Sequence, residues 1–150
     1  MDTLLRDYAG DELRDVNWDG HIDYVASSYS GAGCCPRDEK VAYLYNEQTG
    51  DFYPAFFFNP EFNDAEKVVY NTNYASPGQL VIDKSRWEGL DLVLVESIYP
   101  TLVANSLDVV AKPYTFTRIT YPDKKEQIIK DVPEEYKKLK IYEYFISYQE

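Results

Sequence analysis

The sequence predicts an all-β protein, and three observations support this fold class. Short runs rich in Val, Ile, Tyr and Phe recur roughly every 8–12 residues, which is the spacing of strands in small β domains. The chain contains 15 Tyr and 7 Phe, and aromatic and β-branched residues favour strands. Gly, Pro and Asn separate these runs, and no long helical pattern alternates with them. We therefore expect an antiparallel meander, either propeller-like, barrel-like or packed as a sandwich, with one short C-terminal helix.

The length and composition suit one domain. A chain of 150 residues with a hydrophobic fraction of 45% is sufficient for a single all-β domain, residues 1–150, with a buried core. No apolar run approaches the ~18 residues that a membrane-spanning helix needs. The sequence therefore predicts neither a disordered chain nor a membrane span.

In the first half of the chain, turn residues divide the expected strands. Residues 1–14 are expected to form an edge strand or an irregular lead-in. Residues 46–50 have the pattern of a hairpin turn, and residues 30–40 and 59–64 are expected to be loops. Pro54 lacks a backbone N–H, so its strand is expected at a sheet edge or at a bulge. The strands expected here are residues 22–29, 41–45, 52–58 and 67–74.

In the second half, residues 90–98 form the clearest strand of the chain. Residues 131–139 are expected to be the short helix, because Pro133 lies near the first turn and acidic residues precede lysines, as the helix dipole favours. Residues 140–148 fit a strand or a helix. The other strands expected here are residues 79–87, 103–111, 113–121 and 125–130.

The stretch Asp15–Asp23 has the pattern D-x-N-x-D-G-x-x-D, which is typical of a calcium-binding loop. Oxygen-bearing side chains at alternate positions can face one centre, and Gly20 allows the sharp turn between them. Hard oxygen ligands suit Ca²⁺, whereas the absence of a soft ligand in the pattern argues against zinc. The predicted Ca²⁺ ligands are Asp15, Asn17, Asp19, the backbone carbonyl of His21, and Asp23.

The loop differs from an EF-hand. Loop position twelve, where an EF-hand has a bidentate Glu, is Ala26. The residues after the loop favour a strand rather than a helix. The loop is therefore similar to the strand-flanked loops of FG-GAP and dockerin-type repeats, and Asp11 and Glu12 are the nearest candidates for the missing ligand. The alternative is a metal-free hairpin turn, because Asn, Asp and Gly are ordinary turn residues.

The two cysteines, Cys34 and Cys35, are adjacent in the chain. They cannot join distant segments, but they can form a vicinal disulfide, stay reduced or cross-link to another chain. A C-x-x-C motif is absent, so thioredoxin-like chemistry is not indicated. We expect a structural role at the tip of a loop.

The net charge of −11 is concentrated in the first half of the chain. Residues 1–75 contain 14 acidic and 5 basic residues, whereas residues 76–150 contain 12 and 10. The phosphates of nucleic acids would be repelled by such a surface. A basic partner would be attracted to it, although a charge that only maintains solubility is an equally good interpretation.

The order of these elements resembles a known family. The calcium-loop pattern is followed by a strand and then by the stretches VAYLYNEQTGDF, NPEFNDAEKVVYNT and QLVIDKSRWEGLDLVLVESIY. Over residues 13–98 this order is similar to that of small secreted, calcium-binding, β-propeller-like proteins, which include lysozyme inhibitors and immunity proteins of antibacterial secretion systems. The resemblance implies a protein partner such as a lysozyme-like hydrolase, whose active site is plugged by a protruding loop. The loop Gly31–Arg37 is the candidate here, with Cys34, Cys35 and Arg37 as partner-binding residues.

No catalytic group is predicted. The only histidine, His21, lies in the calcium loop, and no carboxylate pair is distinguished by its spacing. We expect a non-enzymatic binding protein that recognises a protein partner. The alternatives are a surface carbohydrate-binding module that uses exposed aromatic residues and, third, a glycan hydrolase.

The expected location is outside the cytoplasm, in the periplasm or at the cell surface. Cytosolic Ca²⁺ is too low to fill an ordinary loop of this kind, and the chain starts abruptly at Met1, as expected of a secreted protein or lipoprotein without its leader.

Overall fold

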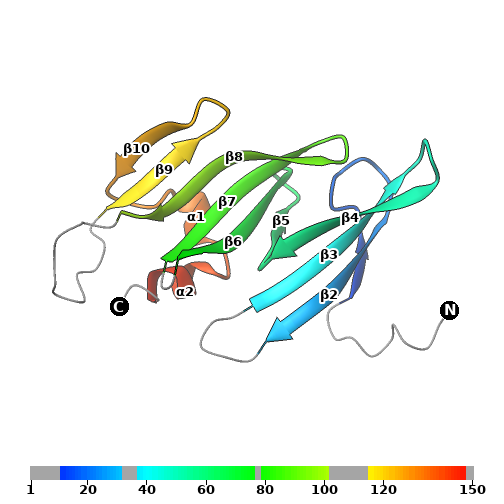
Figure 1. Cartoon of the computed structure of the whole chain (residues 1–150), viewed down its shortest axis with the longest axis horizontal. Helices are drawn as coiled ribbons and strands as arrows, with labels where there is room; N and C mark the ends of the chain where they lie inside the picture. Colours follow the sequence, from blue (N-terminus) through cyan, green and yellow to red (C-terminus); the bar gives the residue numbers. More distant parts are fainter. Residues whose placement is uncertain (1–10, 32–36, 77–78, 102–114, 148–150) are drawn as a thin grey trace. The chain divides into compact units, whose positions relative to one another are not determined.

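The fold is all-β, and within the described residues helices are present only near the C-terminus (Figure 1). The structure is a computed structural model that describes residues 11–31, 37–76, 79–101 and 115–147. Two antiparallel sheets follow the chain order, so the predicted antiparallel meander is confirmed. Neither sheet closes into a barrel.

The first sheet has four strands in the order β1-β2-β3-β4. Each strand pairs with the next through antiparallel hydrogen bonds, and β4 lies at an edge, one of the two places expected for the strand that contains Pro54. The strands are β1 (Glu12–Arg14), β2 (Asp23–Gly31), β3 (Arg37–Asn46) and β4 (Asp51–Phe58).

The second sheet has six strands in the order β10-β9-β8-β7-β6-β5. Two helices, α1 (Glu134–Lys137) and α2 (Tyr142–Ser147), follow its last strand. The strands are β5 (Glu61–Asn63), β6 (Val68–Ser76), β7 (Gln79–Glu88), β8 (Asp91–Pro100), β9 (Phe116–Thr120) and β10 (Lys125–Ile129).

Most predicted elements are present, with two corrections. Residues 37–40, expected in a loop, belong to β3, because they pair with β2 on one side and, at Glu39 and Lys40, with β4 on the other. The expected loop 59–64 contains the short strand β5. In both places pairing with a neighbouring strand outweighs weak local propensity. Residues 140–148, left open between strand and helix, include the helix α2, and the strand expected at 103–111 lies outside the described residues.

The chain divides into two compact units. Unit 1 comprises residues 1–69 and 86–93, and unit 2 comprises residues 70–85 and 94–150. Unit 1 contains 16 acidic and 6 basic residues, a net charge of −10, whereas unit 2 contains 10 and 9, a net charge of −1. The negative charge of the protein is therefore almost entirely a property of unit 1.

The core of unit 1 lies on one face of the four-stranded sheet. Val25, Ala42 and Ala55 form one cross-strand row on that face. Partly buried aromatic residues extend the core, including Trp87, whose indole N–H donates to the backbone oxygen of Val16 at 2.8 Å. The buried members of the core are Val16, Val25, Ala42, Leu44, Phe57 and Val69.

In unit 2 the two helices pack on one face of the six-stranded sheet. Tyr136 of α1 meets Tyr70 of β6 edge to face, with ring centres 5.3 Å apart. Phe145 of α2 stacks on Phe116 of β9 at 5.9 Å. These aromatic contacts supply geometry-specific packing in addition to burial. None of the helices in the described part of the chain is long and apolar enough to cross a membrane.

A buried carboxylate fastens α1 to this sheet. Glu96 of β8 accepts the Tyr136 hydroxyl at 2.5 Å through Oε1, and the Arg118 guanidinium of β9 through Oε2. Burial, together with the hydrogen bond to Glu96, raises the pKa of Tyr136 far above its usual value, so the phenol keeps its proton and donates it.

Tyr136→Phe should lower the free energy of unfolding by about 1.5–3 kcal/mol, because it removes a donor from a buried charged acceptor. Tyr142→Phe is the matched control, since the Tyr142 ring contacts Phe145 but its hydroxyl has no hydrogen-bond partner among the described residues. We expect the control to change stability by no more than about 0.5 kcal/mol. Denaturant unfolding measures both variants, and equal effects would contradict this role for Glu96.

Candidate functional site

The predicted calcium loop connects β1 to β2 in unit 1. Arg14 and Asp23 pair across these strands, so residues 15–22 close a hairpin. Gly20 has a φ angle of 95°, as its place in the pattern requires, and Trp18 has a φ of 57°. A positive φ is unusual for a side chain as large as tryptophan, so contacts beyond the loop must hold Trp18 in place.

The loop is folded around its own carboxylates. Asp15 accepts the backbone N–H of Asp19 at 3.1 Å through one oxygen and that of Gly20 at 2.8 Å through the other. Asp19 in turn accepts the N–H of His21 at 2.8 Å. These hydrogen bonds fix the backbone while leaving further lone pairs on each carboxylate oxygen.

Asp23 is fully buried and joins the loop to β3. Its two oxygens accept the backbone N–H groups of Val16 at 2.9 Å and of Tyr45 at 3.0 Å. Burial raises the pKa of Asp23, the two backbone hydrogen bonds oppose this shift, and the charges of Asp19 and Asp15 raise the pKa further. The three acidic side chains therefore lie close enough to interact electrostatically.

Asn17 is the fourth side chain of the pattern, and it is also buried. Its amide nitrogen donates to Asp19 Oδ2 at 2.9 Å, and its oxygen accepts the N–H of Asp19 at 3.4 Å. In the part of the chain that the structure describes, no three His, Cys, Asp or Glu side chains form a group that could hold a metal ion. The side chains of the predicted ligands lie in one loop and are joined to it by the hydrogen bonds given above.

The His21 ring lies at the edge of the loop. Its Nδ1 is 3.3 Å from Asp19 Oδ1, and its Nε2 is 3.6 Å from Glu47 Oε2 in the β3–β4 turn. The ring also contacts the Tyr45 ring, with centres 5.4 Å apart. The side chain therefore has defined neighbours. If His21 contributes only its backbone carbonyl to a metal ion, as predicted, its ring can make these contacts at the same time.

The nearest candidates for an additional ligand are directed elsewhere. Asp11 accepts the Tyr24 hydroxyl at 2.7 Å and the backbone N–H of Ser27 at 3.2 Å. The Glu12 carboxylate lies 3.9 Å from the Arg14 guanidinium. Asp11 therefore bonds to β2, and Glu12 contacts a residue of its own strand, so neither carboxylate is directed into the loop.

Sequence reasoning did not find the residue that anchors the loop from outside. Asp64, in the turn after β5, accepts the Trp18 indole N–H at 3.0 Å and the Arg14 guanidinium at 2.6 Å. The hydrogen bond from Trp18, and then the positive charge of Arg14, lower the pKa of Asp64. This anchor explains how Trp18 keeps its positive φ angle, and no local pattern links positions 46 residues apart.

The predicted partner-binding loop connects β2 and β3. Gly31 and Arg37 pair at the ends of these strands, which confirms that the loop lies between two strands. Cys34 and Cys35 lie outside the described residues, and of Arg37 only the backbone is described.

Comparison with known proteins matched no protein-family model, no curated protein and no solved structure.

Asp23→Asn should destabilise the protein even in the presence of a chelator. The Asn side chain has one oxygen, which can still accept one of the two backbone N–H groups, but its NH₂ group would face the other. That buried backbone N–H would then have no acceptor, at a cost of about 1–3 kcal/mol. Asp91→Asn, at an exposed carboxylate that starts β8, is the control and should have little effect. If chemical denaturation gave the same midpoint for both variants, Asp23 would not hold the loop against β3.

Proposed function

We propose that the protein is a non-enzymatic, calcium-binding domain that acts outside the cytoplasm and recognises a protein partner, such as a lysozyme-like hydrolase. The observation that carries the calcium part is the loop Asp15–Asp23. There, three carboxylates and one amide lie within nine residues, and one of the carboxylates, Asp23, is fully buried.

The donor set of the loop fits a hard cation. In the described part of the chain, no Lys or Arg nitrogen lies within 4.0 Å of Asp15, Asp19 or Asp23, and the only nearby base is His21. Burying a carboxylate beside two like charges is unfavourable unless a cation offsets it. The residues that would hold Ca²⁺ are Asp15, Asn17, Asp19, Asp23 and the backbone carbonyl of His21.

Bound Ca²⁺ would supply charge neutralisation and crosslinking of the loop, not catalysis. Extracellular calcium modules bind the ion with dissociation constants of about 10⁻⁴–10⁻³ M, far above cytosolic levels. We therefore place the protein in the periplasm or at the cell surface. Its only histidine, His21, contacts Asp19, Glu47 and Tyr45 around the loop, which supports a structural rather than a catalytic part for it.

The protein partner is proposed from charge and from the resemblance of residues 13–98. Unit 1, which contains the loop, has a net charge of −10. Such a charge attracts basic proteins and increases their association rate at low ionic strength. A basic hydrolase of the lysozyme kind fits this requirement.

A carbohydrate-binding module is the second candidate. The rings of Tyr24 and Tyr43 lie side by side on neighbouring strands, 6.1 Å apart and inclined by only 22°. Near-parallel tyrosine rings on a sheet offer a flat surface against which a sugar can stack.

Calcium should raise the melting temperature. A ligand that binds only the folded state adds RT ln(1 + [L]/Kd), or about 2.7 kcal/mol at a hundredfold excess over Kd. Asp19→Ala should remove the difference between calcium and chelator, whereas Asp91→Ala should preserve it. Thermal unfolding with calorimetric titration measures both effects. A melting curve unchanged by calcium, with no heat of binding, would refute the calcium site.

The purified protein should inhibit a lysozyme without hydrolysing peptidoglycan itself. Lysis of peptidoglycan by c-type and g-type lysozymes should fall as the protein is added, and the protein alone should release no muropeptides. Tight binding of a chitin oligosaccharide with no effect on either lysozyme would favour the carbohydrate-binding candidate. Muropeptide release by the protein alone would show that it is an enzyme.

A further inference from the structure

Large apolar side chains are exposed on one face of the four-stranded sheet, opposite the core of unit 1. We call this the outer face. Leu13 on β1 and Phe56 on β4 are the most exposed of these residues, with 72% and 71% of their surface accessible. The outer face consists of Leu13, Tyr24, Tyr43, Tyr45, Phe52, Pro54, Phe56 and Phe58.

Strand register shows that these residues are continuous across the sheet. Leu13 pairs with Tyr24, Tyr24 with Tyr43, and Tyr43 with Pro54, so one apolar row crosses all four strands. Tyr45 pairs with Phe52 in the adjacent row, and their ring centres are 5.4 Å apart. Alternation along each strand places Val25, Ala42 and Phe57 on the other side, in the core.

The area of the outer face is large for a small domain. An aromatic side chain has about 150–250 Å² of surface, so Tyr43, Phe52, Phe56 and Phe58, which are 38–71% exposed, together present roughly 400 Å². Leu13 adds to this area. The largest apolar patches on monomeric proteins are of this size, and they often mark binding sites.

The chemistry of the outer face favours a protein over a sugar. Leu13, Phe52, Phe56 and Phe58 have no polar side-chain atom with which to orient a hydroxyl group. Exposed aromatic side chains without hydrogen-bonding groups suit the dry centre of a protein interface.

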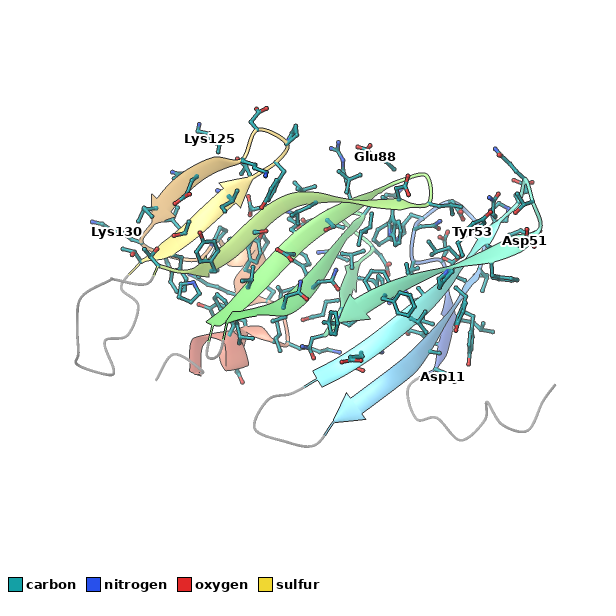
Figure 2. The ribbon with its side chains drawn as sticks, viewed as in Figure 1. Asp11, Asp51, Tyr53, Glu88, Lys125 and Lys130 are labelled. Carbon is teal, nitrogen blue, oxygen red and sulfur yellow. The ribbon has the colours of Figure 1, made fainter. Side chains whose placement is uncertain are left out.

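Acidic residues border the outer face. Asp11 bonds to the Tyr24 hydroxyl, Glu39 pairs with Phe58, and Glu47 lies in the β3–β4 turn; Figure 2 labels Asp11. Among residues 39–45 and 52–58, no Lys or Arg alternates onto this face. An apolar centre with an acidic rim is complementary to a positively charged protein.

The same charge disfavours a second copy of this chain as the occupant. Two copies that meet through this face would bring together two units with a net charge of −10 each. Like charges at close range oppose association, whereas a basic protein gains from the contact.

We propose that the outer face of β1–β4 is the surface on which a positively charged protein docks, with Leu13, Tyr43, Phe52 and Phe56 at the centre of the contact. This rests on the proposed function, because it names the binding surface and the charge of the partner. It differs from the loop Gly31–Arg37 that the sequence indicated.

The calcium loop adjoins one end of this face. The His21 ring contacts Tyr45, and the Tyr45 backbone N–H is held by Asp23. The loop therefore positions the Tyr45–Phe52 pair, and Asp19→Ala should weaken docking less than direct removal of an aromatic side chain.

The test is binding of the full chain to four proteins by biolayer interferometry: a c-type and a g-type lysozyme, cytochrome c as a basic protein that is not a hydrolase, and albumin as an acidic one. Leu13→Ser and Phe56→Ser should each weaken binding to a basic protein at least tenfold, since truncating the centre of an interface has effects of this size. Both side chains are mostly exposed, so folding should be preserved. Ile128→Ser, at an apolar residue of β10 that is 54% exposed, is the matched control and should bind like the unmodified protein. Binding should also weaken as salt is raised.

Four outcomes would overturn the proposal: no binding to any basic protein, binding unaffected by Leu13→Ser and Phe56→Ser, equal binding to albumin, or a dimer of the unmodified protein that these variants dissociate. Lysozyme binding that survives both variants would leave the proposed function intact while removing the outer face from it. Binding of cytochrome c but neither lysozyme, sensitive to both variants, would support the outer face and reject the hydrolase partner.

Discussion

The buried carboxylate of Asp23 is the constraint on which the loop region of unit 1 depends. With one side chain it satisfies two backbone donors, one from the loop and one from β3. Asp23 has no exposed surface, so water cannot replace either of these hydrogen bonds. The loop and the first strands are therefore built as one structure. The cost is a buried negative charge close to Asp15 and Asp19, and this cost is the basis of the calcium proposal.

Much of the fold follows from local sequence patterns. The apolar run Val41–Tyr45 and the turn residues Asn46–Gly50 were sufficient to predict the β3–β4 hairpin. Pro54 indicated that β4 lies at an edge or at a bulge, and the strand is at the edge. Local patterns fail where partners are distant. The charged residues 37–40 join β3 because β2 and β4 lie beside them, and β5 exists only as part of a sheet whose other strands come later in the chain.

The candidate site was predictable only in part, for a related reason. The spacing of Asp15, Asn17 and Asp19 is visible in nine residues, but the anchor of Trp18 on Asp64 joins segments far apart in the chain. The outer face likewise cannot be recognised from the sequence alone. Exposed and buried aromatic residues alternate along β4, and they are of the same residue types. Phe56 and Phe57 are adjacent and identical, yet one is exposed and the other buried. Only the register of β4 on β3 decides which of them faces solvent.

Pro54 has a further consequence, which concerns aggregation. The segment Phe52–Phe58 is short, aromatic and uncharged, and it lies on an edge strand, a combination that invites pairing with the same strand of another molecule. A proline within such a strand removes a backbone donor and interrupts any continuous ladder along the edge. Pro54 thus lets the protein expose an aromatic edge strand while hindering the growth of fibrils from it.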